Sequence, residues 1–150
     1  MRVSGALLSV ALLAGARAYR LPAQDPCALV SREEVGTLVG ASVVSTKPVE
    51  RAALHETRCE YVTATRGTAV VITRTLHRGA SVAQQCHAAQ GPSISGLGDA
   101  ACSFSMPGGA GSWVLVAHGD ESLHVLVSRP ASGDAAVVAR RIAERALTHL

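Results

Sequence analysis

Hydrophobic and polar residues follow a helical spacing at the start of the region after residue 30. Ser31-Arg-Glu-Glu34 is a capping box, in which each of the two end residues can bond the other's backbone amide. Val35, Leu38 and Val39 then form an apolar stripe at helical spacing, and Gly40 is a typical C-terminal residue. The pattern predicts a short helix that ends at Gly40.

The spacing then changes to segments rich in Val, Thr, Ile and Tyr, which is typical of strands. We predict a short strand at 42–46, a loop at 47–56, and two longer strands at 57–64 and 68–76. Thr65-Arg66-Gly67 predicts the turn between the last two.

The second half of the chain repeats this order. Ser81-Val-Ala-Gln84 is a second capping box and predicts a helix over 81–90 that contains Cys86. Three predicted strands follow, at 100–105, 113–117 and 123–128, and the predicted hairpin loops between them are 107–111 and 118–121. A long final helix begins at Asp134, with apolar residues at helical spacing at Val138, Ile142, Ala146 and Leu150.

The predicted order is therefore two α-βββ units and a long C-terminal helix. Two such units favour an α+β fold with one antiparallel sheet and helices packed on one side. The chain has 150 residues, which suits one domain. We assign residues 19–150 to this domain.

Residues 1–18 differ from the rest of the chain. Arg2 precedes an apolar stretch from Val3 to Ala16, and Ala16-Arg17-Ala18 has the small residues of a cleavage site. This pattern predicts a secretory signal peptide, cleaved after Ala18, and an exported protein that is secreted, periplasmic or associated with the cell envelope. A buried first helix and a retained anchor are the alternatives. After cleavage no apolar run is long enough for stable insertion in a membrane.

Charge and composition argue against nucleic acid as a partner. Loss of Arg2 and Arg17 with the predicted signal lowers the formal net charge from +3 to +1, and only 3% of the residues are aromatic. Such a chain has neither the basic surface nor the stacking residues that nucleic-acid binding needs.

Four cysteines in a chain destined for an oxidising compartment predict two disulfides. Each half places one cysteine at or in a helix and one in the strand region that follows, which favours Cys27–Cys59 and Cys86–Cys102 among three possible pairings. A zinc site lacks the usual ligand spacing. A nucleophilic Cys86 beside His87 is a further alternative, although neighbours on a helix point in different directions.

Three segments resemble a known family: Asp25-Pro26-Cys27-Ala28-Leu29, Cys59-Glu60-Tyr61, and Gly96-Leu97-Gly98-Asp99-Ala100-Ala101. They resemble the small exported lipoproteins of unknown function that are common in actinobacteria. The resemblance implies an envelope-facing α+β domain in which Cys27 is joined to Cys59, and it implies no activity. Ala16 stands where the family has its lipidated cysteine, so the resemblance does not extend to a lipid anchor.

Motifs that suggest catalysis are incomplete. The glycine pattern at Gly96–Ala101 matches a dinucleotide fingerprint but precedes a predicted strand, so we interpret it as a tight turn. His55-Glu56-Thr57-Arg58-Cys59 has a cysteine where a zinc protease has its second histidine. We therefore predict no catalytic residues, metal or cofactor.

Two further features remain for function. His118 and His124 flank a predicted hairpin and could face each other as a pH-sensitive pair. Trp113 is expected in the core or at its edge; if exposed, Trp113 with Gly108 and Gly109 is a candidate partner contact. The leading hypothesis is a non-enzymatic exported domain that binds an unknown protein or small ligand at the cell envelope. An apolar-ligand carrier, with its site between sheet and helices, and a small secreted hydrolase are the alternatives.

Overall fold

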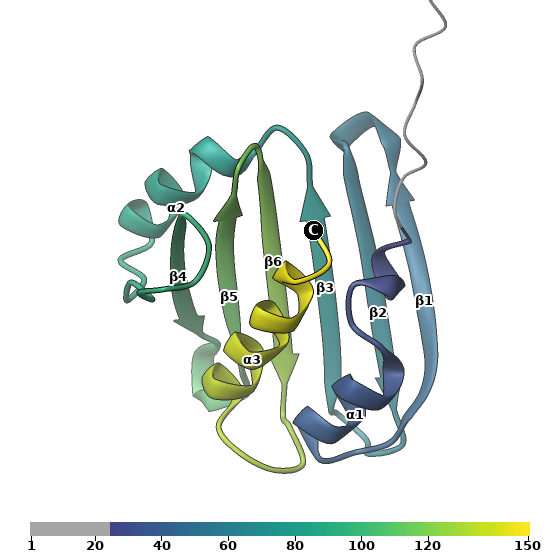
Figure 1. Ribbon diagram of the computed structural model, residues 1–150. Helices are drawn as coiled ribbons and strands as arrows, with labels where there is room; N and C mark the ends of the chain where they lie inside the picture. Colours follow the sequence, from purple (N-terminus) through teal and green to yellow (C-terminus); the bar gives the residue numbers. More distant parts are fainter. Residues whose placement is uncertain (1–24) are drawn as a thin grey trace, which may run out of the picture.

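The computed structural model describes residues 25–150, which form a six-stranded antiparallel sheet with helices on it (Figure 1). The predicted signal peptide, residues 1–18, lies outside the described residues. The strand order is β1-β2-β3-β6-β5-β4. The strands are β1 Val43–Arg51, β2 Glu56–Thr63, β3 Ala69–Thr75, β4 Ala100–Ser105, β5 Gly111–His118 and β6 Glu121–Ser128.

This order confirms the predicted α+β class with two α-βββ units. Each unit contributes three neighbouring strands, and the last strands of the two units, β3 and β6, pair at the centre of the sheet. The helices of the described residues are α1 Arg32–Val39, α2 Val82–Ala88 and α3 Ala135–Leu147, with short 3-10 turns η1 Pro26–Ala28, η2 Ala52–Leu54, η3 Gly79–Ser81 and η4 Pro107–Gly109.

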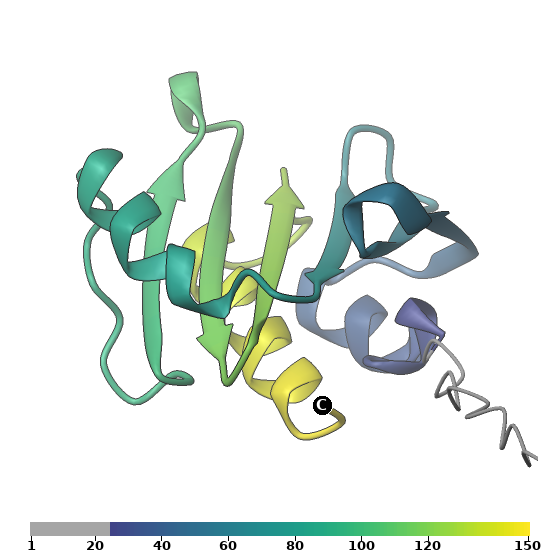
Figure 2. The same cartoon turned by 90° about the horizontal axis from the view of Figure 1, so that it is seen from above.

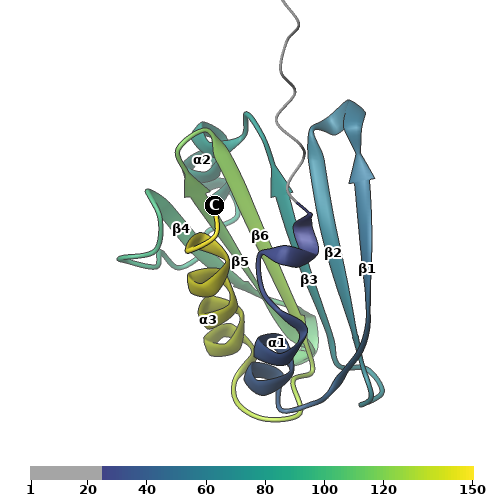
Figure 3. The same cartoon turned by 45° about the vertical axis from the view of Figure 1, so that its right-hand side comes forward.

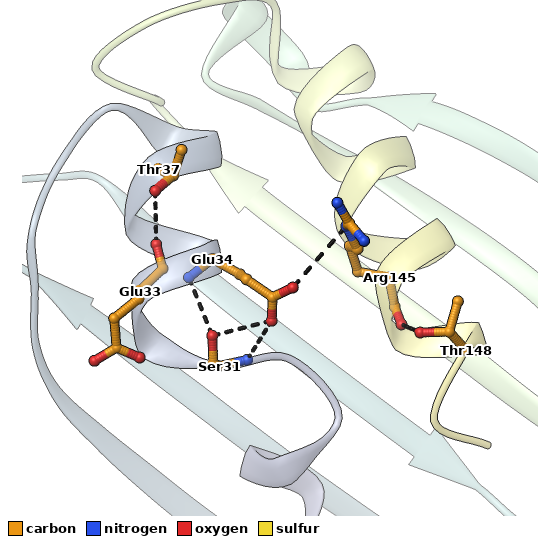
Figure 4. Close-up of polar contacts among 6 residues, drawn as sticks. All are labelled: Ser31, Glu33, Glu34, Thr37, Arg145 and Thr148. Atoms are coloured by element: carbon orange, nitrogen blue, oxygen red, sulfur yellow. Dashed lines mark hydrogen bonds and ion pairs between the residues drawn. The ribbon is translucent and has the colours of Figure 1, made fainter.

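The first capping box forms as predicted and fixes the start of α1. Ser31 Oγ accepts a hydrogen bond from the Glu34 amide at 3.2 Å, and Glu34 Oε2 accepts one from the Ser31 amide at 3.1 Å (Figure 4). The other carboxylate oxygen of Glu34 lies 4.0 Å from Nε of Arg145 on α3. The same side chain therefore caps α1 and connects it to α3, although the exposed ion pair itself contributes little stability.

Helices lie on both faces of the sheet, which corrects the expectation of helices on one side. α1 and α3 pack on one face, in front of the strands in Figures 1 and 3, and Figure 2 shows α1 below the strands of the first unit. α2 lies on the opposite face, where its Val82 packs against Cys102 and Leu115. The amphipathic α3 already covers β5 and β6 on the face that it shares with α1. The helix of the second unit, α2, therefore packs on the opposite face.

The main core lies between the sheet and the pair α1 and α3. Tyr61 on β2 is only 1% exposed there, and its hydroxyl donates a 2.7 Å hydrogen bond to the Val30 carbonyl. Burial is the main reason that the pKa of Tyr61 is raised to about 12. The front-facing side chains of β3, β5 and β6 complete this core with Val70, Ile72, Val114, Val116, Leu123, Val125 and Val127.

The two disulfides have the pairing that the repeated helix-then-strand order predicts. Cys27 of η1 is bonded to Cys59 of β2, and Cys86 of α2 is bonded to Cys102 of β4. Each bond therefore attaches a short helical segment to the sheet, the first on one face and the second on the other.

Two local predictions are wrong. β1 continues to Arg51 through the first half of the predicted loop. It is an edge strand paired with β2 from Val43 to Arg51, and its exposed residues lack an apolar pattern that would have indicated this length. Pro48 is compatible with an edge strand. The second capping box does not form: Ser81 already has helical dihedral angles, and its hydroxyl donates to the Arg78 carbonyl instead.

Within the part of the chain that the structure describes, the helices are too short and too polar to cross a bilayer.

Candidate functional site

The face of the sheet opposite α1 and α3, here called the open face, carries the candidate site. Strand register aligns one row of its side chains: Arg58 on β2, Thr73 on β3, His124 on β6 and Leu115 on β5. Alternation along each strand turns these side chains away from the main core. α2 packs mainly on β4 and β5 at one end of this face.

A groove of about 620 Å³, here called the Trp113 groove, lies on the open face beside the end of α2. A volume of this size falls within the range of small-molecule sites. Its lining is mostly apolar and contains no Asp, Glu, Lys or Arg: Gln85, Ala88, Ala89, Phe104, Ser105, Met106, Pro107, Trp113, Val114, Leu115 and His124.

Two aromatic residues on paired strands form the floor of the groove. Trp113 on β5 lies directly opposite Phe104 on β4 in the strand register. Gly91 leaves room for the Phe104 ring, because a Cβ at that position would lie 2.4 Å from its Cε1 atom. The loop after α2 therefore helps to set the position of the Phe104 ring.

Trp113 is 48% exposed and belongs to neither apolar cluster, so the expectation that it lies in the core or at its edge is wrong. Its strand position explains this: Val114, the next residue along β5, faces the main core, and Trp113 faces the other way. Gly108 and Gly109, in the turn before β5, have φ angles of 71° and 68°, and the space around both is open. Their role as a partner contact, together with Trp113, stays a prediction.

A second hollow of about 190 Å³, here called the Arg58 hollow, continues along the open face. It shares Trp113 and His124 with the Trp113 groove. The shared side chains make the two hollows neighbours on one surface. Its complete lining is Arg58, Val71, Thr73, Trp113, His124, Val125 and Leu126.

Arg58 is the charged residue of the second hollow. Its Nη2 atom lies 2.8 Å from Oε1 of Glu60, two residues along the same strand. Its Nε atom is buried and makes no hydrogen bond with the described residues. A buried N–H without an acceptor is costly and therefore merits an explanation.

His124 lies between the two hollows. Burial is the main reason that its pKa is lowered, and the nearby charge of Glu56 acts in the opposite direction. The imidazole is therefore neutral at pH 7, with one ring nitrogen as a donor and the other as an acceptor.

The predicted pairing of His118 with His124 does not occur. His118 is opposite Glu121 at the end of the hairpin, while His124 is opposite Leu115. Alternation along the two strands places the two histidines on opposite faces of the sheet, so they cannot form a pH-sensitive pair.

The structure brings together another histidine pair that the sequence pattern does not reveal. His77 Nδ1 contacts Asp120 Oδ2, and the His55 ring lies edge-on to His77 with 5.6 Å between ring centroids. The three residues come from three separate loops, so no local spacing could have indicated them. Both His77 and Asp120 are more than two-thirds exposed, and neither lines the Trp113 groove.

The segments that resembled catalytic motifs have structural roles. Gly96 and Gly98 adopt positive φ angles in a turn that leads into β4, as the tight-turn interpretation predicts. Gly98 also allows close packing, since a Cβ there would lie 2.3 Å from the Ala117 carbonyl oxygen. All four cysteines are in disulfides, and the described residues contain no group of His, Cys, Asp and Glu side chains arranged to hold a metal ion.

Comparison with known proteins gives no match: no protein-family model, no curated protein and no solved structure is significantly similar to this chain. The geometry of the open face is therefore the basis for the proposed function.

Proposed function

We propose that this protein is an exported, non-enzymatic binding domain that holds the apolar part of a small ligand in the Trp113 groove. The observation that carries the proposal is the half-exposed Trp113 beside Phe104 in a groove without acidic or basic residues. An exposed aromatic surface in a concave apolar site is typical of ligand binding.

Burial of Trp113 alone provides a substantial part of the binding energy. With 48% of the residue exposed, a ligand that covers it removes on the order of 100 Å² from water. At about 25 cal/mol per Å² this contributes about 2–3 kcal/mol. The remaining groove surface adds to this value.

The two disulfides support the proposal that the protein is exported. Cys27–Cys59 and Cys86–Cys102 use every cysteine of the chain, as is usual in oxidising compartments. The signal-like pattern at residues 1–18 is the independent sequence argument for export.

The positions of Ser105 and His124, which both line the groove, support a binding role over hydrolysis, because β5 separates their strands β4 and β6. A hydrolase of the kind considered from the sequence needs a serine or cysteine activated by a base. The cysteines are bonded to one another, and the His77–Asp120 pair is an exposed surface contact. The groove is lined by residues of both the sheet and α2, so its position also fits the hypothesis of an apolar-ligand carrier.

The neutral apolar dye phenylnaphthylamine tests this proposal, because its fluorescence increases when it leaves water. Trp113 is the only tryptophan of the chain, so energy transfer from it to the dye also reports where the dye binds. We expect binding with energy transfer, and at least about fivefold weaker binding by Trp113→Ala, which corresponds to about 1 kcal/mol.

Leu54→Ala is the matched control, since Leu54 is 54% exposed on η2 and does not line the groove. Thermal unfolding of both variants checks that they fold. Equal dye binding by the wild type and folded Trp113→Ala would contradict the proposal, as would binding without energy transfer.

A further inference from the structure

We infer that the ligand of the Trp113 groove is a single-chain amphiphile with an anionic head group, and that this head group binds at Arg58. The inference rests on the proposed function and names the chemical class of its ligand. The apolar chain would lie in the Trp113 groove, and the head group would lie in the Arg58 hollow.

The register of the strands provides a path of suitable length. Leu115, His124, Thr73 and Arg58 are direct neighbours on β5, β6, β3 and β2. Adjacent strands are about 4.8 Å apart, so the row extends roughly 14 Å from the groove to Arg58. Trp113 and His124 line both hollows, so an extended chain could lie across the strands without leaving the surface.

The distribution of charge identifies the kind of head group. Arg58 is the only charged residue among the described residues that line either hollow, and neither lining contains an Asp or a Glu. A cationic head group would find no carboxylate in these linings. An anionic head group would find a guanidinium, which binds carboxylate and phosphate oxygens with charge-assisted hydrogen bonds.

Arg58 has donors to spare for such a ligand. A guanidinium has five N–H groups, and the Glu60 contact is at Nη2. The buried Nε makes no hydrogen bond with the described residues, so the Glu60 contact uses only part of the donor capacity of the guanidinium. The hydroxyl of Thr73 and the neutral ring of His124 line the same hollow and can also donate. Glu60, which pairs with Arg58, and Glu56, whose charge acts on His124, lie outside the lining and partly oppose an anion there.

Trp113 fluorescence distinguishes ligands that differ only in the head group. We would titrate the exported protein, below micelle concentrations and at mildly alkaline pH, with dodecanoate, dodecyl phosphate, dodecanol and dodecyltrimethylammonium. We expect both anions to bind about tenfold more tightly than dodecanol, and the cation to bind more weakly than dodecanol.

Three variants test whether the Arg58 hollow binds the head group. Arg58→Gln should weaken dodecanoate binding about tenfold and leave dodecanol binding unchanged. Arg66→Gln, in the exposed turn between β2 and β3, is the matched control and should change neither. Thr73→Val, which keeps the volume of the side chain, should weaken dodecanoate binding by a few-fold and takes the place of Arg58→Gln if that variant does not fold.

The outcomes separate this inference from the proposed function. Equal affinity for the anions and dodecanol, or equal losses for both in Arg58→Gln, would overturn the inference and leave the groove proposal intact. Binding to anionic lipid vesicles without binding to free dodecanoate would also overturn it in favour of a membrane surface. Failure of every amphiphile and of phenylnaphthylamine to bind would contradict the proposed function itself.

Discussion

Tyr61→Phe removes one buried hydroxyl and tests how the N-terminal part of the domain is attached to the sheet. The hydroxyl donates to the Val30 carbonyl at 2.7 Å, and Tyr61 and Val30 are each 1% exposed. Val30 lies between η1 and α1, so this hydrogen bond joins the segment before α1 to β2. The replacement keeps the ring and therefore leaves the packing volume almost unchanged.

Burial of the Tyr61 hydroxyl and the Val30 carbonyl determines how much stability Tyr61→Phe loses. A hydrogen bond contributes about 0.5–1.5 kcal/mol to stability, and a buried group left without its partner costs about 1–3 kcal/mol. Since a phenyl ring cannot donate to the Val30 carbonyl, we expect the free energy of unfolding to fall by about 1–3 kcal/mol at neutral pH. Thr37→Val is the control: it removes an exposed hydroxyl that donates to the Glu33 carbonyl at 2.9 Å (Figure 4), and should cost about 0.5 kcal/mol or less.

The pH dependence provides a second, independent test. Burial raises the pKa of Tyr61 in the folded protein to about 12, above its ordinary value of 10.0. The folded state therefore holds the phenol proton more tightly than the unfolded state does. The resulting stabilisation is complete below pH 10 and is lost as the pH rises from about 10 to about 12, and it amounts to about 2–3 kcal/mol.

Urea unfolding followed by Trp113 fluorescence measures both effects. The wild type should exceed Tyr61→Phe in stability at about pH 7, and this difference should shrink at about pH 11, where only the wild type loses the Tyr61 contribution. A loss below about 0.5 kcal/mol at neutral pH would refute the hydrogen-bond argument. A difference that is the same at both pH values would refute the argument from burial.

Two further predictions concern the disulfides and His124. Removal of either disulfide, in Cys27→Ser/Cys59→Ser or Cys86→Ser/Cys102→Ser, should lower the free energy of unfolding in urea by about 3–4 kcal/mol. The loss should be about 0.6 kcal/mol larger for the first variant, because its disulfide closes a loop twice as long, with sequence separations of 32 and 16. A larger loss for the second variant would contradict this explanation. Because burial lowers the pKa of His124, the unfolded chain takes up the proton first, so wild-type stability should fall as the pH drops below about 6.5. His124→Gln should show a weaker dependence between about pH 8 and pH 5, and equal slopes would show that His124 is not the cause.

Local patterns in the sequence were sufficient to predict the order of most helices and strands. Ser31 and Glu34 fix the start of α1 by contacts within one helical turn, so they could be recognised without knowledge of the fold. The same applies to β4, whose predicted range equals the observed Ala100–Ser105. Ser81 shows the limit of this approach, since the preceding turn η3 changed its backbone conformation and prevented capping.

The disulfide pairing was predictable because each bond joins segments within one α-βββ unit. Cys27 and Cys59 belong to the first unit, and Cys86 and Cys102 belong to the second. A repeated order of elements therefore contained the information needed, even though four cysteines allow three pairings.

Trp113 was a candidate contact from the sequence, but its exposure and its neighbours in the candidate site were decided by tertiary structure. Trp113 looked like a core residue because β5 is apolar on both faces, and only the placement of α3 and α2 on opposite sides determined which of its residues were covered. Arg58 and His124 are far apart in the sequence, and the pairing of β2, β3 and β6 brings them into one row. Periodicity shows which residues share a face of a strand, but the partner strands and the helix that covers each face are set by long-range packing.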